Sequence, residues 1–127
     1  NVFVLQSTDE MKQGSGLYVP GYGLFTSYHV TEDKDFYYLW QNDVKAVTSP
    51  ISADINQVSA DKIIDYALYN ISIANIASLS MGNSSNLKIG DTVVIAGFPN
   101  YIKGDTITKE ECKITGKTNC LERLFIK

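Results

Sequence analysis

The only histidine of the sequence, His29, has a side chain that can take up and release a proton near neutral pH. It follows a glycine-rich turn and the apolar residues Leu24 and Phe25, a pattern typical of a short strand that enters a loop. A histidine at the end of a strand can be held in place and still reach a cleft. A single histidine is more often structural, so its use as a general base is a hypothesis that needs a partner residue.

Asp65 is the candidate partner. It follows Ile63 and Ile64 and precedes Ala67 and Leu68, so we expect its carboxylate to be partly buried. Burial of a carboxylate is unfavourable unless the group accepts hydrogen bonds or forms an ion pair, and a histidine N–H is a suitable donor. The alternative is a turn residue that caps the start of a strand, as we expect for Asp61.

The elements around these residues are mainly short strands. Apolar or aromatic segments separated by glycine, asparagine and proline are typical of an all-β barrel or sandwich. Residues 73–81 fit either a helical turn or an extended connector, and no longer segment has helical periodicity. The segments that we predict as strands are 2–5, 16–19, 24–26, 36–40, 67–71, 92–97, 112–116 and 121–127, and residues 44–58 alternate loosely, with a bend or an edge at Pro50.

Several motifs follow one another in the order of the trypsin-like (chymotrypsin-fold) serine peptidases. Residues 14–17 and 26–30 resemble the family's Gly-Ser-Gly-Phe and Thr-x-x-His-Val motifs. Residues 65–68 resemble its Asp-Tyr/Ile-Ala-Leu motif, and residues 87–99 resemble the segment that opens its second barrel. The resemblance is closest to the bacterial glutamyl-endopeptidase and HtrA-like branches.

The resemblance implies an antiparallel Greek-key β-barrel of the trypsin-like double-barrel fold, with the second barrel incomplete. We expect residues 1–80 to form the first barrel, which carries His29 and Asp65. Residues 81–86 are small and polar and are predicted to be a linker. Residues 87–127 are expected to be the opening strands of the second barrel.

The resemblance also implies a mechanism of peptide-bond hydrolysis by a Ser-His-Asp triad. His29 is then the general base, and Asp65 orients it. The family's Gly-x-Ser-Gly-Gly motif follows a strand that resembles residues 124–127, so we expect the nucleophile beyond Lys127. The oxyanion hole and the specificity pocket are expected there too, so this chain alone is predicted to be inactive. The choice between serine and cysteine as nucleophile stays open.

Tyr28 departs from the family pattern, which has a small residue or asparagine before the histidine. Its ring could crowd the cleft or pack against the barrel. The function expected first is a portion of a serine endopeptidase that acts on polypeptides. The alternative is an inactive pseudopeptidase barrel that binds peptides or proteins, and an incomplete second barrel could also self-associate or exchange strands.

Charge and hydropathy exclude several other classes. The net charge of −3 and the pI near 5.0 argue against a nucleic-acid partner, which usually requires a basic surface. No apolar run approaches the roughly 18 residues of a membrane span, so no membrane segment is predicted. The start of the chain does not resemble a signal peptide, and the sequence does not indicate a compartment.

No cofactor or metal is expected, because one histidine and two cysteines without a Cys-x-x-Cys spacing are a poor set of zinc ligands. Cys112 and Cys120 flank a predicted hairpin, where they could form a disulfide or remain free thiols. The aromatic segment at residues 36–40 could be a stacking platform for bases or sugars. Core packing and cross-strand pairing explain this segment better in an acidic chain.

Overall fold

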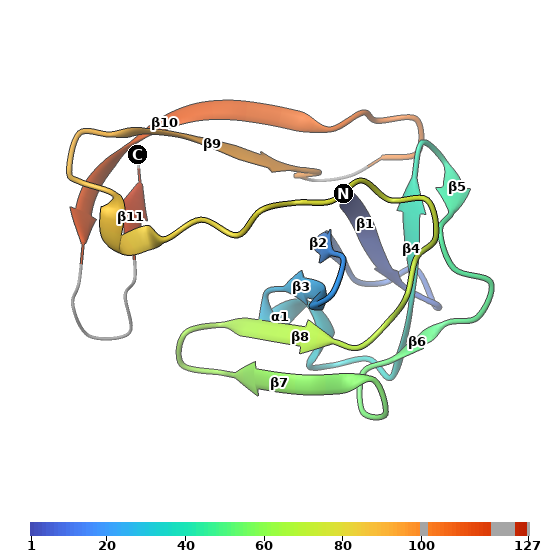
Figure 1. The fold of residues 1–127 in the computed structure, drawn as a ribbon. Coiled ribbons are helices and arrows are strands. Elements are labelled where there is room, and N and C mark those ends of the chain that lie inside the picture. Colours follow the sequence, from blue (N-terminus) through green and yellow to red (C-terminus); the bar gives the residue numbers. More distant parts are fainter. Residues whose placement is uncertain (100–101, 118–123, 127) are drawn as a thin grey trace. The chain divides into compact units, whose positions relative to one another are not determined.

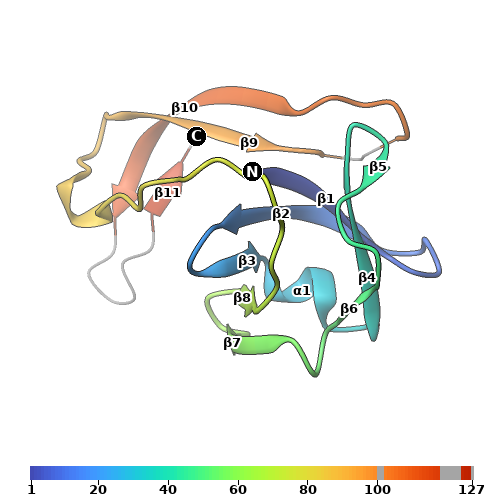
Figure 2. The same cartoon turned by 45° about the vertical axis from the view of Figure 1, so that its right-hand side comes forward.

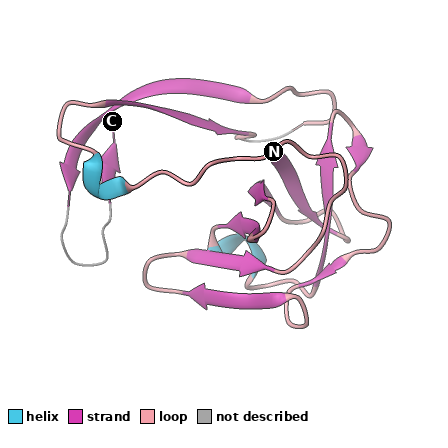
Figure 3. Cartoon of the chain, viewed as in Figure 1, coloured by secondary structure: helices cyan, strands magenta, loops and turns pink. Residues whose placement is uncertain are grey.

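The computed structural model describes residues 1–99, 102–117 and 124–126, and in them nearly all regular structure is antiparallel strand (Figure 3). The prediction of an all-β fold is thereby confirmed. The contacts divide the chain into two compact units, Asn1–Leu79 with Gly97–Thr108, and Ser80–Ala96 with Lys109–Lys127. No helix of the described residues is long and apolar enough to cross a membrane.

The first unit contains an eight-stranded sheet (Figure 1). Its spatial order is β5-β4-β1-β2-β3-β8-β7, and β6 pairs with β4. The order β4-β1-β2-β3 is that of a Greek key. The strands are β1 (Val2–Ser7), β2 (Gln13–Val19), β3 (Gly23–Thr26), β4 (Phe36–Gln41), β5 (Val44–Lys45), β6 (Ile51–Ser52), β7 (Gln57–Asp61) and β8 (Tyr66–Tyr69).

The ladder of this sheet is open between β6 and β7 in the described part of the chain. A turn separates the two strands, and its side chains bind the backbone donors. The Ser52 N–H donates to Asn56 Oδ1 at 2.9 Å, and the Ile55 N–H donates to Ser52 Oγ at 3.0 Å. Since these donors serve the turn, they are not available for a strand ladder that would close the barrel.

The second unit has a three-stranded sheet in the order β11-β10-β9, with β9 (Thr92–Gly97), β10 (Thr108–Lys117) and β11 (Leu124–Ile126). A 3₁₀ turn, η1 (Ser84–Asn86), precedes it. The Gly90 N–H donates to the Ile114 carbonyl, and the Ile114 N–H donates to the Asp91 carbonyl. Of the two alternatives for the cysteines, the structure has Cys112 as a buried free thiol in β10, and Cys120 lies outside the described residues.

The main core of the first unit lies on one face of the sheet, and the alternation of side chains along β4 shows which face it is. In β4, Tyr37 and Leu39 are almost fully buried, whereas Tyr38 and Trp40 are partly exposed on the other face. The buried cluster consists of Phe3, Leu5, Tyr18, Leu24, Val30, Tyr37, Leu39, Ile51, Ala67 and Tyr69.

The structure adds one helical turn that the sequence pattern did not predict. This helix, α1 (Tyr28–Thr31), follows β3 and lies next to β8 (Figures 1 and 2). Gly14 makes room for it, since a Cβ there would lie 2.6 Å from Val30 Cγ2. The first glycine of the Gly-Ser-Gly motif thus allows the turn that carries His29 to sit close to the sheet.

Gly23 has a backbone conformation with φ near +126°, and a Cβ on it would collide with the Tyr69 carbonyl of β8. We predict that Gly23→Ala lowers the free energy of unfolding by more than about 2 kcal/mol, because both the backbone and the β3–β8 pairing must shift. Gly21→Ala is the matched control, since Gly21 has φ near +89° but open space around it. Backbone strain alone should lower the free energy of unfolding of Gly21→Ala by about 1 kcal/mol. Urea unfolding of both variants measures the difference, and equal losses would contradict the steric explanation.

Candidate active site

The His29 backbone is held by Asp65. His29 is the second residue of α1, and the Ser27 side chain makes no capping hydrogen bond at the start of this helix. The His29 N–H instead donates to Asp65 Oδ1 at 2.8 Å. A carboxylate from a distant hairpin therefore provides the N-terminal acceptor that a neighbouring serine often supplies.

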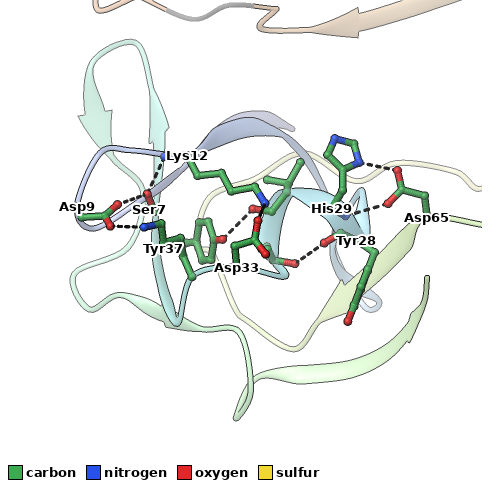
Figure 4. A network of polar contacts seen from close by, with 11 residues as sticks. Ser7, Asp9, Lys12, Tyr28, His29, Asp33, Tyr37 and Asp65 are labelled. Atoms are coloured by element: carbon green, nitrogen blue, oxygen red, sulfur yellow. Dashed lines mark hydrogen bonds and ion pairs between the residues drawn. The ribbon is translucent and has the colours of Figure 1, made fainter.

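The second oxygen of the same carboxylate meets the His29 ring. Asp65 Oδ2 lies 2.6 Å from Nδ1 (Figure 4). Because a carboxylate can only accept, Nδ1 carries the proton and donates, and Nε2 of the neutral ring is left as a proton acceptor. Figure 4 shows the second ring nitrogen pointing away from Asp65. The side chain of His29 is 64% exposed, so Nε2 is open to an incoming group.

Asp65 lies at the end of the β7–β8 turn with φ near +58°. Aspartate tolerates this left-handed conformation better than most residues. Asp61 holds the same turn by accepting from the Ile63 N–H at 2.8 Å, as expected for a turn residue. Across the hairpin the hydroxyls of Ser59 and Tyr66 are hydrogen-bonded. The turn therefore directs Asp65 toward α1 and uses Asp61 for its own backbone.

The hydrogen bond from the His29 backbone N–H lowers the pKa of Asp65 below its ordinary value of 3.8, and the His29 ring lowers it further. Partial burial opposes this shift. The donors bind the charged form and so favour it. The carboxylate is ionised over the range in which a histidine exchanges its proton.

Two tyrosines hold α1 from the core side, and the sequence analysis did not identify them. The Tyr37 hydroxyl donates to the Val30 carbonyl at 2.7 Å, and the Tyr69 hydroxyl lies 2.6 Å from Thr31 Oγ1. Burial raises the pKa of Tyr37 to about 12 and also raises the pKa of Tyr69, so both phenols keep their protons. The sequence signal for Tyr37 was its alternate, core-facing position in β4, whereas Tyr69 bonds to Thr31, 38 positions earlier.

Tyr28 packs against the core cluster and points away from the His29 ring (Figure 4). Of the two alternatives for this residue, packing against the sheet is the one observed. The chain therefore accommodates a large side chain before the histidine without covering the ring.

A second polar network, which includes Asp9, Lys12 and Asp33, lies to the left of His29 and Asp65 in Figure 4. Lys12 pairs with Asp33 at 2.9 Å, and Lys34 pairs with Asp9 at 2.8 Å. The Lys34 ammonium holds the pKa of Asp9 far below its usual range. Each pair joins a half-buried lysine to an exposed aspartate, so it stabilises the loop ends by little, and neither pair contacts His29. In the described part of the chain no three acidic, histidine or cysteine side chains are grouped as metal ligands.

A sequence model of the trypsin-like peptidase domain matches residues 14–123. The structure of the HtrA-type protease AlgW with a tripeptide is similar, with a TM-score of 0.71 and 24% identity over 91% of this chain and 36% of that one. A serine endoprotease from Yersinia pestis has a TM-score of 0.71 and 22% identity over 97% of this chain and 43% of its own.

An inactive form of a protease from M. tuberculosis is similar too, with a TM-score of 0.64 and 19% identity over 92% of this chain and 51% of that one. The chain therefore spans about a third to a half of the length of these solved proteases. They confirm the predicted trypsin-like β fold. No curated protein has significant sequence similarity to the chain.

We predict that Asp65→Asn lowers the free energy of unfolding by about 1 kcal/mol at pH 6, because a neutral amide oxygen replaces the charged acceptor of the hydrogen bonds from the His29 backbone N–H and ring. The folded-state pKa of Asp65 is lowered, so its stabilisation is complete above 3.8 and is lost as the pH falls below that value. The difference between the wild type and the variant should therefore shrink from pH 4 downward. Urea unfolding at several pH values measures it.

Asp61→Asn is the control for this experiment, since asparagine can keep the acceptor of the turn and Asp61 does not contact His29. It should change stability little. Equal losses for the two variants would mean that the carboxylate of Asp65 has no special role in holding α1.

We also predict that Tyr37→Phe costs roughly 2 kcal/mol, because the buried Val30 carbonyl loses its donor. The comparison is Tyr22→Phe, whose ring is 57% exposed, for which the change should stay within about 0.5 kcal/mol. Thermal unfolding of the two variants side by side tests this. A Tyr37→Phe variant as stable as the wild type would remove the tyrosine from the support of α1.

Proposed function

The chain belongs to the family of trypsin-like peptidase domains, and on that basis we propose that it is a portion of a serine endopeptidase that hydrolyses peptide bonds. The observation that carries the proposal is the contact of both Asp65 oxygens with one residue, His29. This contact gives the ring the tautomer and the fixed orientation that a general base requires.

In the proposed reaction, His29 Nε2 takes the proton of the nucleophile as it attacks the peptide carbonyl. The ring then gives that proton to the leaving amine. Asp65 keeps the proton on Nδ1 and stabilises the imidazolium that forms between the two steps. The nucleophile and the oxyanion hole belong, in this proposal, to residues beyond Lys127.

The proposal includes the division of the chain into a first barrel at residues 1–80, a linker at residues 81–86 and the start of a second barrel at residue 87. The substrate is an extended polypeptide. Specificity is left, in this proposal, to the remainder of the protein.

The second candidate is a peptide-binding module without catalysis. It is favoured by one observation, the position of β7 at the edge of the sheet with Val58 61% exposed. An extended peptide could add to such an edge through its backbone. This function requires neither a nucleophile nor the His29–Asp65 pair.

The decisive experiment uses the complete gene product. We expect a Gly-x-Ser-Gly-Gly segment downstream of Lys127, labelling by a fluorophosphonate and hydrolysis of casein. His29→Ala should abolish turnover, and Asp65→Asn should lower kcat by about 10⁴ because the ring adopts the wrong tautomer. Asp61→Asn, from the same turn, should retain activity.

A folded, complete protein that has the segment but neither reacts with the label nor cleaves peptides would rule out the enzyme. Retained binding of an extended peptide would then support the module. Equal activity of Asp65→Asn and the wild type would reject Asp65 as the orienting residue while leaving the enzyme in place.

A further inference from the structure

A pocket of about 190 Å³ opens on the first unit and shares no residue with the His29–Asp65 site. Its lining residues come from the β1–β2 hairpin, β4, the β4–β5 turn and the segment after β9. Its lining residues are Gln6, Glu10, Gln13, Trp40, Asp43 and Lys103. All of them belong to the first unit, so the pocket is formed within one compact part of the chain.

Strand pairing holds the walls of the pocket in place. Gln6 pairs with Gln13 in the β1–β2 ladder, so the two amides point to the same face of the sheet. Trp40 pairs with Lys45 in the β4–β5 ladder. Because the Gly104 N–H donates to Asp43 Oδ1 at 3.0 Å, the segment after β9 is fastened to the β4–β5 turn. The backbone that carries the lining residues is therefore held by strand pairing and by this hydrogen bond.

Trp40 supplies an aromatic wall. Its ring belongs to the outward face of β4, and the Lys45 ammonium lies 5.4 Å from its centroid and 3.9 Å from that of Tyr38. Core packing and cross-strand pairing are what the sequence pattern favours for residues 36–40, and Trp40 does pair with Val4 of β1. The structure places Tyr37 in the core but leaves the Trp40 ring partly exposed at the pocket.

The polar groups of the pocket include donors and acceptors that the protein does not use. Within the described ranges, the side chains of Gln6, Glu10 and Lys103 and the Trp40 indole N–H have no hydrogen-bond partner. Gln6 and Lys103 can donate, and Gln6 and Glu10 can accept. A ligand that fits must therefore offer both kinds of group around one small ring.

We propose that this pocket binds a neutral sugar ring. Each hydroxyl group of a sugar both donates and accepts, so it can pair with the ammonium, the amides and the carboxylates in turn. The C–H face of the ring can lie on Trp40, as the apolar part of a ligand lies on aromatic linings in general. The carboxylates of Glu10 and Asp43 would repel an anion such as phosphate, and the Lys103 ammonium would repel a simple cation.

This inference does not depend on the proposed catalysis, and its test is separate. Saturation-transfer NMR detects the probe itself, with glucose and N-acetylglucosamine as the sugars and with inorganic phosphate and arginine amide as charged comparisons. Trp40 is the only tryptophan among the 127 residues, so a saturable change in tryptophan fluorescence provides a second readout. If the protein measured is longer and contains other tryptophans, subtracting the fluorescence of the Trp40→Phe variant isolates the Trp40 signal.

We expect saturable binding of at least one sugar, and a loss of about tenfold in affinity for Gln6→Ala and for Glu10→Gln. Gln57→Ala, an exposed glutamine on β7, is the matched control and should bind as the wild type does. Asp65→Asn should also bind normally. Saturation by phosphate or arginine amide alone, or no saturable binding of either sugar by folded wild-type protein, would overturn the proposal.

Discussion

The Asp65 carboxylate is the interaction on which the site depends, because it binds the backbone and the ring of His29 at once. A helix of one turn has no stability of its own, since the cost of starting a helix is not recovered over so few residues. Its position must come from the rest of the fold. One charged side chain therefore both stabilises the turn and orients the imidazole.

The other contacts of α1 make this arrangement rigid. Gly14 allows Val30 to approach the sheet, and the Tyr37 hydroxyl satisfies the Val30 carbonyl from the core. The anchoring groups come from β2, β4, β8 and the β7–β8 turn, which are far apart in the sequence. Rigid support on the Nδ1 side and an exposed ring on the Nε2 side are what a general base requires.

The two faces of the sheet in the first unit serve different sites. Tyr37 and Leu39 of β4 join the core that supports α1, while Trp40 of the same strand lines the pocket that we assign to a sugar. Period-two alternation along one strand creates this division without extra elements. The open ladder at the turn between β6 and β7 does not affect either site, because the core side chains and the β1–β2–β4 pairing are complete without it.

The sequence by itself determined the fold class, the turn role of Asp61, and His29 and Asp65 as the residues to examine, because strand periodicity, turn residues and motifs are local. Only the tertiary structure decided that Asp65 caps α1, and that Tyr37 and Tyr69 hold it. It also joined residues 97–108 to the first unit. The Asp65 and Tyr69 contacts pair residues 36 and 38 positions apart. Burial of a common core, which no short segment encodes, brings the elements that carry them together.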